Sequence, residues 1–234
     1  MILCIETATD LCSVALCERN GVIAIRESDK GRSHASLLTV FIQDLLNETG
    51  IITADLEAVV VSKGPGSYTG LRIGVSAGKG IAYASSVPLI GIDTTLSMFY
   101  GFTEKYAGKY EPAPTDLFCP ALDARRMEIY NSIFDVNGNI IRKIRAEIMD
   151  KNSFIDIPET SRILLFGNGA GKCKDVITRK NILFDGDFSI SASFMLKPAY
   201  EALSRHHFED VAYFEPFYLK DFLFSKPVKN LPWK

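Results

Sequence analysis

The sequence predicts an α/β protein of two lobes, each with the element order β-β-β-α-β-α-β. Three observations support this. Short apolar runs form an antiparallel meander at the start, apolar runs then alternate with helical patterns, and the same order recurs after a segment at 107–115 with two prolines. Such alternation is typical of a sheet with helices packed on its faces. We therefore expect a first lobe at 1–106, a smaller second lobe at 107–218 and a tail at 219–234.

The first lobe begins with strands expected at 2–5, 12–18 and 21–28. Asn20-Gly21 is a strong signal for a hairpin between the last two. Apolar residues at helical spacing follow Ser33, a candidate N-cap, and end at Gly50. The remaining elements of this lobe are expected to be a buried strand at 58–61, a helix at 71–85, a strand at 88–92 and a helix from Thr95.

The second lobe repeats this order with shorter elements. Asn137-Gly138 marks a second hairpin, and the short helical patterns predict a trimmed copy of the first lobe. The tail carries three lysines and two prolines in SKPVKNLPWK and cannot continue a helix. The expected elements of the second lobe are strands at 117–122, 128–135, 140–148, 163–166 and 182–184, and helices at 150–156, 170–178 and 192–206.

Composition excludes several classes of protein. The 234 residues include 47% hydrophobic and 23% charged side chains with a net charge of −2. These values exclude a disordered chain and argue against a protein that coats nucleic acid by phosphate neutralisation alone. No apolar run approaches the roughly 20 residues that span a bilayer, and the start MILCIETATD lacks a basic n-region. Five cysteines without a C-x-x-C pair indicate free thiols in a reducing cytoplasm.

A glycine-rich turn, GPGSYTG, follows the buried strand at 58–61 and opens a helix. Helix N-termini attract phosphate, so nucleotide binding is one interpretation. The residues match neither the P-loop nor the G-x-G-x-x-G pattern. The other interpretation is that the glycines let strand and helix pack closely. The residues concerned are Gly64, Gly66, Ser67, Thr69 and Gly70.

Other chemical motifs are weak. The turn at 167–172 occupies the matching place in the second lobe and also fails both patterns. The arginines of Asp123–Arg126 fit an anion or an acidic partner as well as a solvated turn with an ion pair. His34 has no second histidine at helical spacing, and the adjacent His206 and His207 would point apart on a helix. We therefore expect no metal site.

The helix at 71–85 is rich in glycine, and each interior glycine costs about 0.8–1 kcal/mol relative to alanine. Close approach of another backbone would offset that cost. Gly74 and Gly78 lie one turn apart and form a strip without side chains. The neighbour is either the sheet of the same lobe or a helix of another subunit. A surplus of apolar residues on the helix at 33–50, which includes Val40, favours a subunit interface.

Several segments together identify a family. ILCIETATDLCSVAL, SHASLL, GPGSYTGLRIGVSAGKGIA, PLIGIDT and ALDARRMEIY, in this order, resemble the TsaB family over residues 1–135. The resemblance implies an actin-like ATPase fold (ASKHA, ribonuclease H-like) in two lobes. The paralogue TsaD holds a metal through a His-x-x-x-His pair, whose positions fall here on Thr94 and Met98. Thr7–Asp10, at the place of the family's nucleotide hairpin, has no glycine.

The resemblance implies a non-catalytic subunit of the complex that transfers threonylcarbamoyl to N6 of the adenosine next to the tRNA anticodon. It would bind and stabilise TsaD and support recruitment of the ATPase TsaE. Alone, it would be either a monomer or a homodimer. It would reach tRNA only through the complex, with no cofactor of its own, while ATP and a metal belong to the partners. A metal-dependent glycoprotease-like peptidase and an ATP-dependent kinase of the same fold stay as alternatives. The implied partner interface comprises Leu37, Phe41, Leu45, Arg72, Gly74, Ala77, Gly78 and Ile81.

Overall fold

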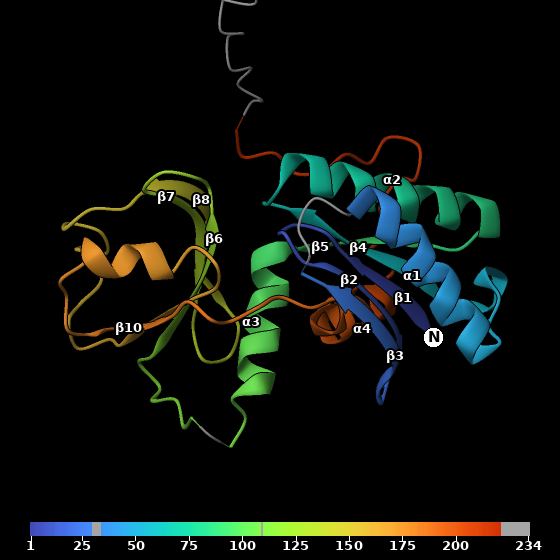
Figure 1. The fold of residues 1–234 in the computed structure, drawn as a ribbon. Coiled ribbons are helices and arrows are strands. Elements are labelled where there is room, and N and C mark those ends of the chain that lie inside the picture. The colour runs from blue at the N-terminus through green and yellow to red at the C-terminus, as the bar shows by residue number, and fades with distance from the viewer. Residues whose placement is uncertain (30–33, 109, 221–234) are drawn as a thin grey trace, which may run out of the picture.

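The structure is a computed structural model that describes residues 1–29, 34–108 and 110–220. It consists of two five-stranded mixed sheets, with helices packed on the first and between the two (Figure 1). The fold class predicted from the sequence is confirmed. The predicted N-cap Ser33 and most of the predicted tail, 221–234, lie outside the described residues.

The first sheet has the strand order β3-β2-β1-β4-β5. β1 pairs antiparallel with β2 and parallel with β4, and β4 pairs parallel with β5. Helices α1 and α2 cover one face, where they pack on the side chains of Leu3 and Ile5. The elements of this lobe are β1 Ile2–Glu6, β2 Cys12–Glu18, β3 Gly21–Ser28, α1 His34–Thr49, β4 Ala58–Gly64, α2 Tyr68–Ser85, β5 Leu89–Asp93 and α3 Thr94–Lys105.

The second sheet has the corresponding order β10-β9-β6-β7-β8. Helix α3 stands between the two sheets (Figure 1), where Phe99 and Phe102 pack on Phe118 and Phe166. The strands of the second sheet are β6 Leu117–Asp123, β7 Glu128–Phe134, β8 Ile140–Ile148, β9 Ile163–Phe166 and β10 Ile182–Asp185.

Two of the helices predicted in the second lobe are wrong. Residues 150–156 form turns because the side chains of Asp150 and Ser153 bond to nearby backbone amides, which offers the backbone an alternative to the helix. The predicted helix at 170–178 is a short 3-10 turn, η2 Gly171–Asp175. The helix predicted at 192–206 begins as a 3-10 turn, η3 Ala192–Met195, and continues as α4 Leu196–Ser204.

The predicted boundary at 107–218 does not follow the packing of the last helix. Ala192, Met195 and Ala199 pack on the face of the first sheet opposite α1 and α2, against Cys4 and Val60. The second lobe therefore ends before η3, and the chain returns to cover the first lobe. None of the helices in the described residues is long and apolar enough to cross a membrane.

Residues 207–220 form a segment that we call the C-terminal strap. Its backbone bonds to the edge strand β5 through Glu209 N–H and Leu89 O at 2.9 Å, and to β4 through Phe217 N–H and Lys63 O at 2.6 Å. At its end the Lys220 ammonium contacts the Glu128 carboxylate of β7. The strap thus joins the first lobe to the second.

Candidate protein interface on the first lobe

The glycine-rich turn packs directly on the turn after β1. A Cβ atom on Gly66 would overlap Ala8, and one on Gly70 would overlap the carbonyl oxygen of Thr7. The Ser67 N–H donates to Ala8 O at 2.7 Å, and the Ser67 hydroxyl caps α2 by accepting from Gly70 N–H at 3.3 Å. The glycines therefore let the glycine-rich turn and the turn after β1 pack closely against each other.

The other members of this turn have separate surroundings. Gly64 has φ of +118°, a backbone conformation that favours glycine, and its Cα faces the carbonyl oxygen of Phe217 in the strap. Thr69 is exposed on the first turn of α2. Gly64 ends β4 whereas Thr69 lies in the first turn of α2, so the two residues have different neighbours.

A buried carboxyl group lies beneath these turns. Glu6 at the end of β1 is 0% exposed, and its Oε1 accepts from Ala8 N–H at 2.6 Å and from the Ser62 hydroxyl at 2.8 Å. Burial raises the pKa of Glu6 to about 7, although the hydrogen bonds from Ala8 and Ser62 act to lower it. Sequence reasoning missed this site, and its only signal was an acidic residue ending an apolar strand.

The positions of the family's histidine pair do not fit a metal. Thr94 is 0% exposed and Met98 is 1% exposed, so both face the interior at the start of α3. Neither supplies an imidazole. Of the three histidines, His34 is buried, with its Nε2 atom 3.2 Å from the carbonyl oxygen of Leu11. His206 and His207 are exposed. Across the described ranges, no three His, Cys, Asp or Glu side chains gather as metal ligands would.

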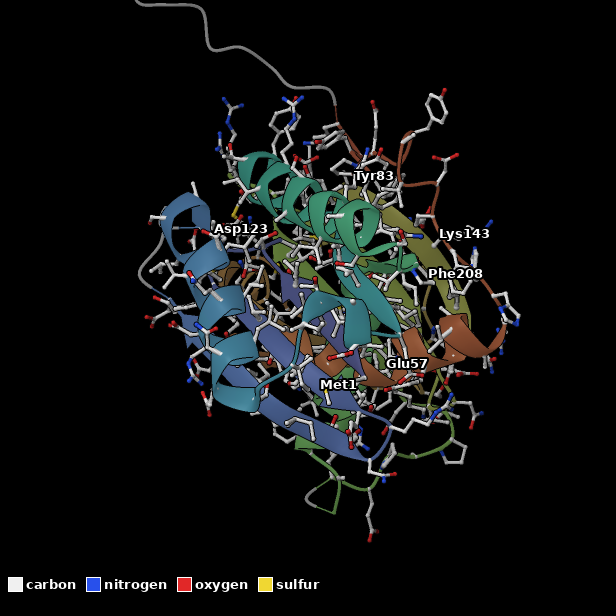
Figure 2. The ribbon with its side chains drawn as sticks, turned by 90° about the vertical axis from the view of Figure 1, so that its right-hand side faces the viewer. Met1, Glu57, Tyr83, Asp123, Lys143 and Phe208 are labelled. Carbon is white, nitrogen blue, oxygen red and sulfur yellow. The ribbon has the colours of Figure 1, made fainter. Side chains whose placement is uncertain are left out.

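Helices α1 and α2 lie side by side (Figure 1). Their outer surface carries apolar side chains. Phe41 and Ala77 are half-buried, and Val40 is 46% exposed. Gly80 has open space where a Cβ would stand, so another chain can approach the α2 backbone there. Tyr83, 80% exposed, lies on the outer side of α2 (Figure 2). We call this surface the α1–α2 face; its apolar members are Leu37, Val40, Phe41, Ile73, Ala77 and Ile81.

Three residues of the predicted interface do not reach this face. Leu45 is 0% exposed in the core of the first lobe. A Cβ on Gly74 would overlap the Thr7 hydroxyl, and one on Gly78 would overlap Val61 of β4. The strip without side chains therefore faces the chain's own sheet, which corrects the prediction that it faces a partner. The physical reason is that the apolar side of α2 must cover β4.

Arg72 lies at the edge of the α1–α2 face, near the strap. Its guanidinium is 5.2 Å from the centre of the Tyr68 ring, and Nη1 donates to the Tyr68 hydroxyl at 3.1 Å. The Tyr68 ring also packs on Tyr218 at 4.7 Å between centroids. Arg72 is thus exposed but held in place by an aromatic neighbour.

The turn at Asp123–Arg126 is stabilised by an ion pair within the second lobe. Lys172 of the neighbouring turn contacts the Asp123 carboxylate and donates to Glu128 O at 2.6 Å. Arg125 and Arg126 have positive φ angles and exposed side chains. The ion pair at this turn therefore joins Asp123 to Lys172 rather than to either arginine of the turn.

This architecture defines a class of protein with the two-lobed actin-like ATPase fold. A Pseudomonas aeruginosa structure described as YeaZ matches with a TM-score of 0.80 at 23% identity, over 93% of this chain and 99% of that one. A second structure from the same organism, described as an uncharacterized protein with similarity to peptidase YEAZ, matches equally well over 94% and 99%. At this identity the likeness shows the fold.

The chain belongs to the family described as TsaD: tRNA N6-adenosine threonylcarbamoyltransferase, whose sequence model matches residues 25–221. Similar curated proteins carry the name tRNA threonylcarbamoyladenosine biosynthesis protein TsaB, which confirms the resemblance seen in the sequence. The Escherichia coli protein is 35% identical over 139 residues, 58% of this chain and 57% of that protein. The Bacillus subtilis protein is 29% identical over 143 residues, 61% and 58%. The matched part spans a little over half the length of these relatives.

Proposed function

We propose that the chain takes part in threonylcarbamoyladenosine biosynthesis in tRNA as a non-catalytic subunit that binds a TsaD transferase. The observation that carries the proposal is the pair of positions at the start of α3. Thr94 and Met98 are buried side chains that cannot hold a catalytic metal, although the chain belongs to a transferase family. The names of the similar TsaB proteins support the same pathway.

The α1–α2 face is the surface that we propose for TsaD. Apolar side chains on two adjacent helices, beside an open backbone at Gly80, suit packing against two helices of a partner. Leu37, Phe41, Ala77 and Ile81 would contact the partner, and Arg72 would lie at the rim. The same face would support the homodimer when TsaD is absent. Recruitment of TsaE and a cytoplasmic location belong to the same proposal.

Co-purification with the TsaD of the same organism tests this role. Phe41→Glu and Ala77→Glu place a charge on the face at half-buried positions, and we expect loss of binding because an unpaired carboxylate is costly in a closed interface. Ile155→Glu is the matched control, because Ile155 is 77% exposed in the second lobe. Full binding by both face variants, with the folded state verified by thermal unfolding, would overturn the interface.

Activity of the isolated chain tests the non-catalytic role. We expect neither ATP turnover above a heat-inactivated sample nor stoichiometric metal by elemental analysis after gel filtration. Metal together with peptide hydrolysis would favour the peptidase alternative, and phosphoryl transfer from ATP would favour the kinase. Either result would contradict the proposal even if TsaD binding were intact.

A further inference from the structure

A cavity of about 600 Å³ lies between the lobes under the C-terminal strap. It is distinct from the turns described above, since neither Thr7–Asp10 nor Gly66–Gly70 lines it. Its lining is mainly apolar. Two of the apolar lining residues are exposed to solvent, Phe217 at 43% and Ile140 at 59%. The apolar lining consists of Leu96, Phe134, Ile140, Ile144, Phe214 and Phe217.

Two buried hydroxyl groups line the same cavity without partners. Thr95 is 0% exposed and Ser132 is 1% exposed. Within the described part of the chain, neither hydroxyl has a hydrogen-bond partner. Buried polar atoms are nearly always bonded in folded proteins. The cavity thus calls for an occupant that is largely apolar and carries a hydrogen-bonding group.

The charges that line the cavity favour a basic occupant. Five charged side chains of the described chain line it: Lys63, Asp93, Lys143, Glu209 and Glu215. Lys63 and Asp93 form an ion pair at 3.6 Å, which leaves two carboxylates and one ammonium group. The salt bridges of the described residues include none with Glu209, Glu215 or Lys143. A segment that combines an aromatic side chain with neighbouring lysines therefore matches the cavity in both polarity and charge.

We propose that residues 221–234 of this chain supply that occupant and that Trp233 enters the cavity. Trp233 is followed by Lys234 and preceded by Leu231-Pro232, and it is the single tryptophan of the sequence. Its indole N–H is a donor for the Ser132 or Thr95 hydroxyl oxygen, and a buried tryptophan removes a large apolar area from water. Lys229 and Lys234 would face Glu209 and Glu215.

The segment after Lys220 begins close to the cavity and is long enough for Trp233 to reach it. Phe217 lines the cavity, and Lys220 is bonded to Glu128 only three residues later, so the segment begins beside the site. The chain from Lys220 to Trp233 can span up to roughly 40 Å when extended. The cost of closing such a loop grows only slowly with its length.

The emission of Trp233 in the full chain tests the proposal. We expect a blue-shifted spectrum and weaker quenching by acrylamide than in a free peptide of residues 221–234. Ile140→Lys, which adds a cation to the cavity wall, should abolish both effects. Ile141→Lys is the matched control, since Ile141 is 58% exposed on the same strand but does not line the cavity. Peptide-like emission in the unmodified chain, or equal behaviour of the two variants, would overturn the proposal.

A second measurement does not depend on the fold of the Ile140 variant. In the full chain, Trp233→Ser should speed hydrogen exchange at the amides of 140–144, and unchanged exchange would contradict docking. Dilution identifies whose tail is bound. A blue shift that persists on dilution supports docking within one chain, whereas a shift lost on dilution means that a second copy supplies the tail and refutes the proposal as stated.

Discussion

Gly78 of α2 lies directly against Val61 of β4, and there is no room between them for even a methyl group. Two residues further along the helix, Gly80 faces open space. Gly78 and Gly80 of α2 therefore lie in opposite surroundings, one closely packed and one open. One lets the helix approach its own sheet, and the other leaves the outer backbone bare.

Alanine at these two glycines should change stability in opposite directions. Gly78→Ala forces the new Cβ into Val61, and we expect a loss of about 1–3 kcal/mol in the free energy of unfolding. Gly80→Ala adds a methyl group in open space, and the better helix propensity should add about 0.5–1 kcal/mol. Urea unfolding of both variants measures the difference. Equal effects would mean that α2 does not pack as described.

The buried Glu6 should make stability depend on pH. Its pKa in the folded chain is raised from 4.5 to about 7, so between these values the folded state holds a proton that the unfolded state has released. Unfolding then releases a proton, and stability present below pH 4.5 is lost as the pH rises through 7. Relative to Glu6→Gln, the unmodified chain should lose about 3 kcal/mol over this window. Parallel pH profiles for the two proteins would refute the assignment.

Asp116 should contribute more to stability than an exposed carboxylate. Its side chain is 2% exposed and accepts from Arg162 at 2.6 and 3.0 Å and from Ala113 N–H at 2.8 Å. Asp116→Ala should cost about 2 kcal/mol, less than a fully buried pair, because Arg162 is exposed enough to regain water. Glu48→Ala is the comparison, since Glu48 is 52% exposed and its partner Arg26 is 37% exposed. It should cost less than about 1 kcal/mol in the same thermal unfolding experiment.

The chain alone should bind tRNA weakly. Its net charge is −2, and Lys172 and Lys220, which could serve a phosphate, are paired with carboxylates. Release of counterions is therefore a small driving force. Filter binding at about 0.15 M salt should give no sub-micromolar affinity. If such affinity were found, Arg125→Ala and Arg126→Ala would show whether the exposed turn causes it.

Local patterns in the sequence are enough to predict the type of most elements, because periodicity and turn residues act over a few positions. The continuous apolar run of β4, the Asn20-Gly21 hairpin and the glycine-rich turn before α2 are local signals. The same reasoning failed at 150–156, where helical spacing competed with side chains that bond to the backbone. Order, lobe number and fold class follow from local patterns plus the few ways in which such elements can pack.

Local patterns do not predict which faces of these elements pack together in the folded chain. Gly74 and Gly78 form the same strip whether it covers β4 or a partner, and the sequence spacing is identical in both cases. The return of α4 to the first sheet places Ala199 beside Val60 across a large separation in the chain, and so does the contact of Glu6 with Ser62. Such choices depend on the volume and polarity that distant segments bring together, and a pattern of neighbouring residues does not contain that information.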